Sequence, residues 1–243
     1  MEICISNIKK QYNKRTVLDI DELVINKGDI IGVTGNNGAG KTTLLRIILD
    51  LLKSDSGSVS IRGIDVSKDE KWKSYTSAYL DESFLIDFLT PEEYFDFIME
   101  SYEKDLSTCN EKIEDFHLFM NNEILNQKKY IRDFSSGNKQ KIGIIGSIIS
   151  MPEVLILDEP FNYLDPTSQF FTRDYLSQLN KNERVSMVIS SHNLECIYDI
   201  ATRLIVLEKG KIIKRYDSVD VTVKEELNDY FKVTPEGLEQ LRS

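Results

Sequence analysis

Cysteine is scarce in this chain of 243 residues, and the few present do not suit a structural framework. Cys4, Cys109 and Cys196 are odd in number, lie far apart and form no C-x-x-C pair. Disulfide scaffolds and cysteine-based zinc sites depend on paired or closely spaced cysteines. We therefore expect neither, and the composition suits a reducing cytosol.

Long apolar runs are also missing. A membrane-spanning helix needs about 18 or more consecutive apolar residues, whereas the best run, 142–151, is shorter and contains glycine and serine. The N-terminus lacks the basic region and long apolar stretch of a signal peptide. We therefore expect a cytoplasmic protein that acts at a membrane only through a partner.

Positive charge is in deficit. Lys and Arg number 30 against 40 Asp and Glu, which gives a formal net charge of −10. Sequence-independent binding of nucleic acid depends on a basic surface. No nucleic-acid partner is therefore expected.

A phosphate-binding motif is present. The run G-N-N-G-A-G-K-T fits G-x-x-x-x-G-K-[ST], in which backbone N–H groups surround phosphates, the lysine reaches the β and γ oxygens and the hydroxyl meets Mg²⁺. A buried strand predicted at 29–34 and a helix predicted at 41–49 flank it, an order that disfavours a mere glycine-rich turn. The candidate nucleotide ligands are Gly35, Asn36, Asn37, Gly38, Ala39, Gly40, Lys41, Thr42 and Thr43.

An acid pair follows the apolar run 154–157. This run predicts a central parallel strand, whose carboxyl end would place Asp158 and Glu159 beside the phosphates. Asp158 is predicted to hold Mg²⁺ together with Thr42, and Glu159 to orient or deprotonate the attacking water. The pair alone is equally typical of a strand end before a solvated turn, but the motif upstream favours nucleotide hydrolysis.

The order of elements predicts a single α/β domain in several parts. Residues 1–83 and 151–215 are expected to form a catalytic core with an antiparallel β layer and a parallel sheet, because short strands come first and strands alternate with helices later. Residues 84–150 are predicted to form a helical subdomain. The tail, 216–243, either caps the domain or contacts a partner.

Two helices are predicted within the helical subdomain. Thr90-Pro91-Glu92-Glu93 is typical of a helix start, with Tyr94, Phe97 and Ile98 on the apolar face that follows. A second helix is predicted from about Lys139, with isoleucines along one side. These apolar side chains are expected to be core rather than ligand contacts.

Further segments occur in the order found in the ATP-binding-cassette (ABC) ATPases, and over roughly residues 1–215 the chain resembles that family. The segment F-S-S-G-N occupies the position of the family signature L-S-G-G-Q. The resemblance implies that Ser135, Ser136 and Gly137, at a helix start, bind the γ-phosphate of ATP held by an opposite subunit. Ser136 replaces a glycine and Asn138 the glutamine, which are departures from the pattern.

Other positions receive roles from the same resemblance. Tyr12 matches the aromatic residue that stacks on adenine. Asp165 lies in a segment that crosses the dimer interface, and its place before Pro166 is also typical of a helix N-cap. His192 follows a strand and matches the histidine that contacts the γ-phosphate and the attacking water.

Glu82 departs from the family pattern. Most members have a glutamine here, which senses Mg²⁺ and links to the membrane partner, whereas this chain has Asp81-Glu82-Ser83. Glutamate at this position is similar to a subset of bacterial exporters of the bacitracin-resistance and lantibiotic-immunity type. The resemblance implies that Glu82 contacts Mg²⁺, and the alternative is a simple acidic turn.

Taken together, the resemblance implies a P-loop NTPase fold and an ATPase that uses ATP and Mg²⁺. It implies dimerisation with a second ABC ATPase subunit, identical or not, and a separate polytopic membrane permease, an exporter by analogy, at the inner face of the cell membrane. A soluble ABC ATPase acting on nucleic acid or ribosomes is disfavoured by the single cassette and by the short stretch from Lys41 to Ser135, which cannot contain a long coiled coil. A nonhydrolytic regulatory subunit is disfavoured by the intact set of catalytic candidates.

Overall fold

The computed structural model describes residues 1–103 and 111–231, so Cys109 and the end of the tail lie outside the described residues. The strands are β1 Ile3–Tyr12, β2 Arg15–Ile25, β3 Ile30–Thr34, β4 Ser56–Ile61, β5 Ile64–Asp65, β6 Thr76–Tyr79, β7 Val154–Asp158, β8 Ser186–Ser190, β9 Arg203–Glu208 and β10 Lys211–Tyr216. The α-helices are α1 Lys41–Ile48, α2 Pro91–Ser101, α4 His117–Met120, α5 Ser136–Ile149, α6 Pro166–Glu183, α7 Leu194–Tyr198 and α8 Val221–Phe231. Short 3-10 helices are η1 Lys71–Tyr75, η2 Glu82–Phe84 and η3 Ile131–Asp133.

The central sheet has the strand order β10-β9-β3-β8-β7-β6. The strands from β9 to β6 are parallel to their neighbours, as the alternation of strands and helices predicts. The exception is β10, which pairs with β9 in the antiparallel direction. Only Lys209 and Gly210 separate these two strands, which suffices for a hairpin but not for a crossover. β7 lies between β6 and β8, so its polar end emerges inside the sheet rather than at an edge.

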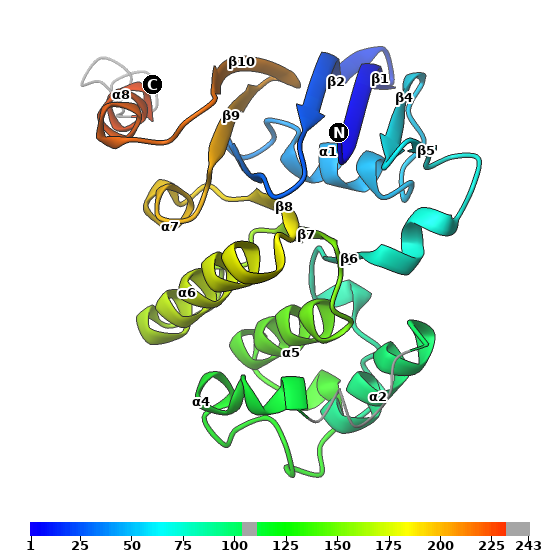
Figure 1. The fold of residues 1–243 in the computed structure, drawn as a ribbon, viewed down its shortest axis with the longest axis vertical. Coiled ribbons are helices and arrows are strands. Elements are labelled where there is room, and N and C mark those ends of the chain that lie inside the picture. The colour runs from blue at the N-terminus through cyan, green and yellow to red at the C-terminus, as the bar shows by residue number, and fades with distance from the viewer. Residues whose placement is uncertain (104–110, 232–243) are drawn as a thin grey trace.

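The predicted antiparallel layer is formed by β2, β1, β4 and β5. Figure 1 shows this layer above β6, β7 and β8 and level with β10, with α1 beside it. Because side chains of a strand point alternately to its two faces, β7 contributes to two cores. Val154 and Ile156 pack toward the β layer and α1, whereas Leu155 and Leu157 pack toward the helical side.

Helix α2 begins where the sequence predicts. Thr90 Oγ1 accepts a hydrogen bond from the backbone N–H of Glu93, and the Glu93 carboxylate accepts one from the backbone N–H of Thr90. The predicted apolar face was only partly right. Phe95 is completely buried beside Tyr94, whereas Phe97 is about half exposed (48%).

Helix α5 begins at Ser136, earlier than predicted, because the hydroxyl of Ser135 accepts a hydrogen bond from the backbone N–H of Asn138 and caps the helix. Its predicted isoleucines are buried. The helix approaches β6 very closely at Gly143. A Cβ atom at this residue would lie 2.0 Å from the ring of Tyr79.

The described part of the tail caps the domain. Helix α8 packs against α7, and its Leu227 is completely buried. Lys214 donates a hydrogen bond to Glu226 at 2.5 Å, and the Tyr230 hydroxyl donates one to Glu208 at 2.8 Å.

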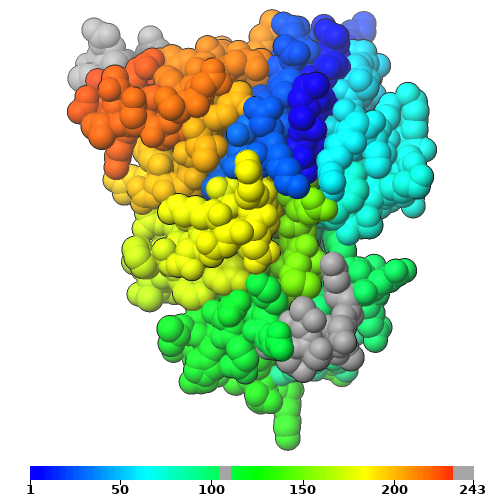
Figure 2. Space-filling model, viewed as in Figure 1, coloured from blue at the N-terminus to red at the C-terminus, as the bar shows by residue number. Residues whose placement is uncertain are grey.

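Figure 2 shows the same side of the molecule, with the helical part (green) below the β layer (blue and cyan). Within 1–103 and 111–231, we find no helix with the length and apolar character needed to cross a membrane.

Candidate active site

The loop between β3 and α1 forms the predicted phosphate-binding turn. Gly35 has a φ of 151°, and a Cβ atom there would lie 2.2 Å from the carbonyl oxygen of Leu207. No other residue type fits this close approach. The turn places Lys41 at the first position of α1, where its ammonium donates a hydrogen bond to the Gly35 carbonyl at 2.8 Å. The positive end of α1 therefore faces the loop together with a buried cation.

Asp158, at the carboxyl end of β7, is held by two hydroxyl groups. Thr42 Oγ1 donates to Asp158 Oδ2 at 2.5 Å, and Ser190 Oγ, at the end of β8, donates to Asp158 Oδ1. Burial raises the pKa of Asp158, and the hydrogen bonds from Ser190 and Thr42 oppose that shift. The start of α1 and the end of β7 therefore bring together Thr42 and Asp158, two of the three residues that the sequence predicts as metal ligands.

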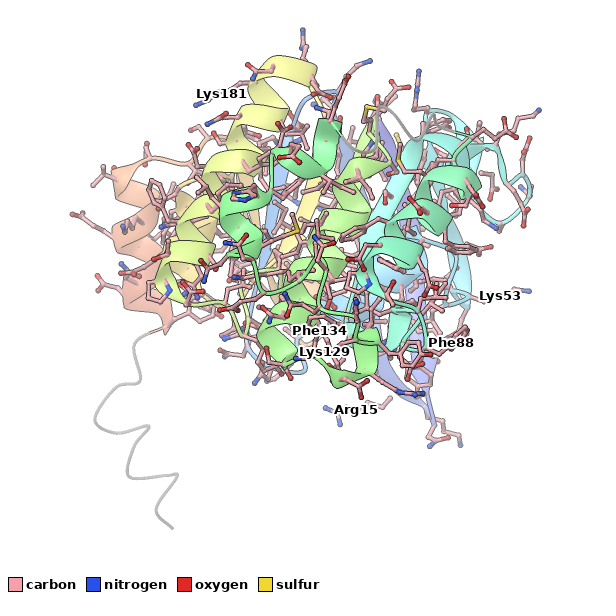
Figure 3. All side chains as sticks on the ribbon, turned by 90° about the horizontal axis from the view of Figure 1, so that it is seen from below. Arg15, Lys53, Phe88, Lys129, Phe134 and Lys181 are labelled. Carbon is pink, nitrogen blue, oxygen red and sulfur yellow. The ribbon has the colours of Figure 1, made fainter. Side chains whose placement is uncertain are left out.

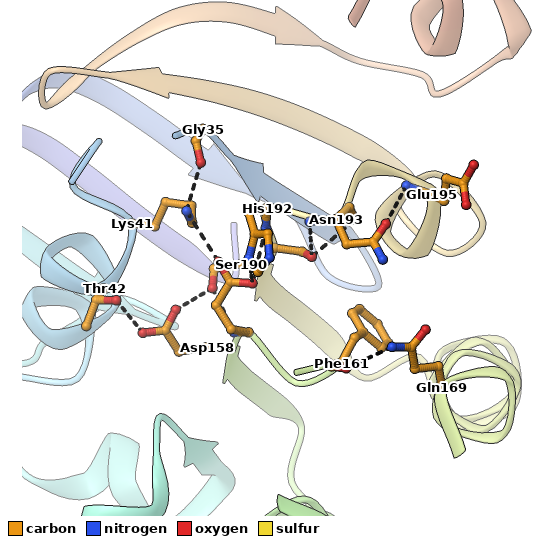
Figure 4. A network of polar contacts seen from close by, with 12 residues as sticks. Gly35, Lys41, Thr42, Asp158, Phe161, Gln169, Ser190, His192, Asn193 and Glu195 are labelled. Atoms are coloured by element: carbon orange, nitrogen blue, oxygen red, sulfur yellow. Dashed lines mark hydrogen bonds and ion pairs between the residues drawn. The ribbon is translucent and has the colours of Figure 1, made fainter. Parts of the chain in front are cut away.

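The Glu159 side chain contacts both Lys41 beside the phosphate loop and His192 after the end of β8. Its Oε1 lies 3.3 Å from Lys41 Nζ, and its Oε2 lies 2.8 Å from His192 Nδ1 (Figure 4). The backbone N–H of His192 donates to the same Oε2 at 3.1 Å. The carboxylate is thus fixed between the two side chains that are predicted to contact the γ-phosphate.

The backbone of Glu159 has a φ of 49°, in the left-handed region that non-glycine residues avoid. Such a conformation costs about 1 kcal/mol or more and persists where the surroundings enforce it. The Glu159 N–H donates to the Ser190 hydroxyl at 2.9 Å, which is part of that enforcement. Strained backbone of this kind is frequent at functional sites.

Two cavities adjoin these residues. One of about 580 Å³ is lined by the phosphate loop, Glu159 and His192. The other, of about 490 Å³, is lined by Asp158, Glu159 and Glu82. Thr42 lines both cavities. Both volumes lie in the usual range for small-molecule sites.

Glu82 is exposed at the start of η2 and lines the second cavity with Thr42 and Asp158. Its Oε2 lies 3.5 Å from Lys139 Nζ. In the part of the chain that the structure describes, no three His, Cys, Asp or Glu side chains come together as a metal cluster. The available donors, a hydroxyl and a carboxylate, fit Mg²⁺ that takes its other ligands from phosphates and water.

Ser135 and the start of α5 lie outside the phosphate loop. Ser135 lines a third cavity, of about 340 Å³, whose lining includes Asn138 and Lys129 but no phosphate-loop residue. Ser136 lines the cavity that also contains Glu82.

Asp165 caps α6. It accepts hydrogen bonds from the backbone N–H of Ser168 at 3.0 Å and from the Ser168 hydroxyl at 2.6 Å. These bonds hold the pKa of the Asp165 carboxyl below its usual range.

Tyr12 does not line the cavity beside the phosphate loop. It lies at the end of β1 with the Lys10 ammonium 5.3 Å from its ring centre. Arg15, directly opposite Tyr12 in the β1–β2 pair, lines that cavity together with Val17. The adenine-stacking role of Tyr12 stays a prediction.

Two contacts in the site had no sequence prediction. Ser190 holds Asp158, and the Gln140 side chain donates a hydrogen bond to the Glu159 carbonyl at 3.2 Å. The signal for Ser190 is a polar residue that directly follows three apolar residues at the end of a strand. Gln140 follows the signature segment, but nothing local indicates its partner.

Comparison with known proteins identifies the family. Residues 18–162 match the family model described as ABC transporter. The chain belongs to this family. It is an ATP-binding subunit with an ABC ATPase domain, and the predicted P-loop α/β fold is confirmed.

Curated relatives and solved structures agree with this assignment. The lantibiotic transport ATP-binding protein SrtF of Streptococcus pyogenes is 33% identical over 218 residues, which are 88% of this chain and 90% of SrtF. The sulfate/thiosulfate import ATP-binding protein CysA of Pectobacterium atrosepticum is 32% identical over 215 residues, which are 87% of this chain and 65% of CysA. A dimeric post-hydrolysis ATP-binding cassette bound to ADP and Pi has a TM-score of 0.79 at 20% identity, over 90% of this chain and 99% of that cassette, and this likeness shows the fold.

Proposed function

We propose that this ATPase subunit hydrolyses ATP with Glu159 as the residue that activates water, and that hydrolysis drives a separate membrane permease. The observation that carries the proposal is the contact of Glu159 with both Lys41 and His192, beside the Thr42–Asp158 pair. A carboxylate that adjoins both a phosphate-binding lysine and an orienting histidine is placed for general-base chemistry on a water molecule.

In the proposed reaction, the loop N–H groups and Lys41 bind the β- and γ-phosphates of ATP. Thr42 and Asp158 would hold Mg²⁺, which neutralises charge on the transferred phosphoryl group when bound. Lys41 can pair with either Glu159 or a phosphate oxygen, so ATP competes with the carboxylate for this ammonium. Glu159, still hydrogen-bonded to His192, then orients the attacking water and accepts its proton.

A second ABC ATPase subunit is the proposed partner in each ATP site. Ser135, Ser136 and Gly137 stand at the start of α5, where backbone N–H groups can bind an anion, and Ser135 opens into a cavity without phosphate-loop residues. This arrangement supports binding of the γ-phosphate of the opposite subunit. Asp165 is proposed to lie along the same interface.

The proposed permease is a polytopic membrane protein, with this subunit on its cytoplasmic side. We propose that Glu82 contacts Mg²⁺ or its water ligands and links the site to the permease, because it lines the cavity of Thr42 and Asp158 while remaining exposed. Glutamate in place of glutamine supports an exporter. The names of the relatives include both lantibiotic transport and sulfate import, and each describes that relative.

The alternative is a soluble ABC ATPase that acts on nucleic acid or ribosomes. The net charge of −10 favours the transporter, because nucleic-acid binding depends on basic surface. A gene for a polytopic membrane protein beside the gene for this chain would support the transporter. A neighbouring gene for a nucleic-acid-processing protein would support the alternative.

Replacement of Glu159 by Gln tests the catalytic proposal. We expect Glu159→Gln to bind ATP with near-normal affinity, to hydrolyse it about 10²- to 10⁴-fold more slowly, and to accumulate as an ATP-bound dimer in size-exclusion chromatography. Glu195→Gln, at an exposed carboxylate on α7, is the matched control and should hydrolyse ATP normally. Turnover by Glu159→Gln close to that of the control would remove Glu159 from this role.

A further inference from the structure

We propose that Gln140 is a positioning residue for ATP hydrolysis, which fixes the backbone of Glu159 and ties it to the start of helix α5. The proposal rests on the catalytic role of Glu159 proposed above. It concerns how that carboxylate is held, and how its position depends on the neighbouring signature segment.

Gln140 is buried between two partners on opposite sides. Its Nε2 donates to the carbonyl oxygen of Glu159 at 3.2 Å, and its Oε1 accepts a hydrogen bond from the Tyr79 hydroxyl at 3.1 Å. Burial raises the pKa of Tyr79, so its hydroxyl stays protonated and can donate to the amide oxygen. The Glu159 carbonyl can only accept, so it faces the amide nitrogen, and the Tyr79 hydroxyl then holds the amide oxygen.

The orientation of the Glu159 carbonyl group is coupled to the position of the Glu159 side chain. It belongs to the residue whose φ is 49°, and it also accepts a hydrogen bond from the backbone N–H of Asn162 at 3.2 Å. Rotation of this peptide group would turn the Glu159 side chain relative to Lys41 and His192. Two donors on one carbonyl oppose that rotation, and Gln140 is the donor that comes from another element.

The same turn of α5 contacts the segment that follows Glu159. A Cβ atom at Gly137 would lie 2.9 Å from the carbonyl oxygen of Tyr163, and Lys141 Nζ lies 4.0 Å from Asp165. Because Ser135 caps this helix, the signature end and Gln140 belong to one rigid element. A shift of Ser135 against a partner's γ-phosphate is therefore transmitted through Gln140 to the Glu159 of the same chain.

The first test is Gln140→Met, which keeps the length of the side chain and removes both hydrogen-bonding groups. We expect kcat of the full chain to fall about tenfold, since small misplacement of a catalytic group has effects of this size or larger. The KM for ATP should stay close to wild type, whereas the midpoint of urea unfolding should fall modestly, because the buried Tyr79 hydroxyl loses its acceptor. Tyr79→Phe should lower kcat less, because it keeps the donor to Glu159 and loses only the group that orients it. Gln178→Met, on the exposed face of α6, is the control and should change nothing.

A double variant separates positioning from general damage. In the Glu159→Gln background, Gln140→Met should cause no further loss of residual hydrolysis, because the two residues act through one carboxylate. Hydrogen exchange provides a readout independent of turnover, in which the Asn162 amide should exchange faster in Gln140→Met than in Gln178→Met.

The outcomes are distinguishable from failure of the proposed function. If Glu159→Gln stops turnover but Gln140→Met changes neither kcat nor exchange at Asn162, the positioning role is wrong and the proposed function stands. If Gln140→Met lowers residual hydrolysis equally in both backgrounds, it acts other than through Glu159. If Glu159→Gln keeps normal turnover, the proposed function fails first.

Discussion

Lys41 contacts both the phosphate loop and the Glu159 carboxylate. Its side chain is 7% exposed, and its ammonium has the Gly35 carbonyl and the Glu159 carboxylate as neighbours. A buried cation needs such partners, since unpaired burial of charge is very unfavourable. The same geometry makes it ready to exchange the carboxylate for phosphate oxygens.

At this scale we expect Lys41→Ala to weaken ATP binding itself. A hydrogen bond to a charged group contributes about 1.5 to 3 kcal/mol, so the Kd for ATP should rise at least about tenfold in isothermal titration calorimetry. Lys181→Ala is the matched control, because Lys181 projects into solvent from α6 (Figure 3). Equal ATP affinity in both variants would contradict the assignment of the phosphate loop.

The sequence predicts individual residues well where a motif couples residue type to backbone shape. The phosphate loop and the Asp158–Glu159 pair are of this kind, because glycine conformation and strand ends are local properties. Ser190 and Gln140 could not be assigned partners. Their contacts exist because β8 lies beside β7 and α5 lies over β6, and neither adjacency is encoded in a short segment.

At the scale of the elements, helix α5 packs closely against β6. Its close approach to β6 depends on the absence of a side chain at Gly143, where the ring of Tyr79 occupies the space. Tyr79 is itself the partner of Gln140, so packing and polar contacts at this crossing depend on each other.

Gly143→Ala is expected to destabilise the protein. Alanine favours a helix over glycine by up to about 1 kcal/mol, but overpacking of a buried contact costs about 1 to 3 kcal/mol. With the Cβ 2.0 Å from a ring atom, overpacking should dominate, and the free energy of unfolding in urea should fall by about 1 to 2 kcal/mol. Asn182→Ala, on the exposed end of α6, should change it by less than about 0.5 kcal/mol. An unchanged or higher stability of Gly143→Ala would show that α5 can shift away from β6.

The elements themselves were largely predictable, but the buried face of α2 was predicted only in part. The capping sequence at Thr90 fixes where α2 begins, but the segment after it is apolar at almost every position. Local pattern alone therefore could not decide between Phe95 and Phe97 as the buried residue. That choice is made by α5 and the core beneath it.

For the whole molecule, the separation of Ser135 from Lys41 matters most, although Ser136 and Thr42 line one cavity together. The phosphate loop and the cap of α5 at Ser135 line different cavities of the same chain. Under the proposed function, Ser135 acts on ATP that is held by a second subunit.

Mixing two inactive variants tests this arrangement. Ser135→Arg alters the signature segment, and Lys41→Ala alters the phosphate loop. In a mixed dimer, one of the two sites would therefore combine an intact phosphate loop with an intact signature segment. We expect the mixture to hydrolyse ATP faster than either variant alone, provided that differently tagged subunits are shown to exchange. Demonstrated mixed dimers without recovered hydrolysis would argue against action of Ser135 across an interface.

The alternation of β7 between two cores has a practical consequence. Leu155 and Ile156 are neighbours in the chain, yet their side chains belong to separate hydrophobic clusters on opposite faces of one sheet. Methyl-selective NMR labels at these two positions would therefore act as adjacent reporters with independent surroundings. A single spectrum could then follow loosening of the helical side and of the β layer separately, because both labels lie on the same strand but face different cores.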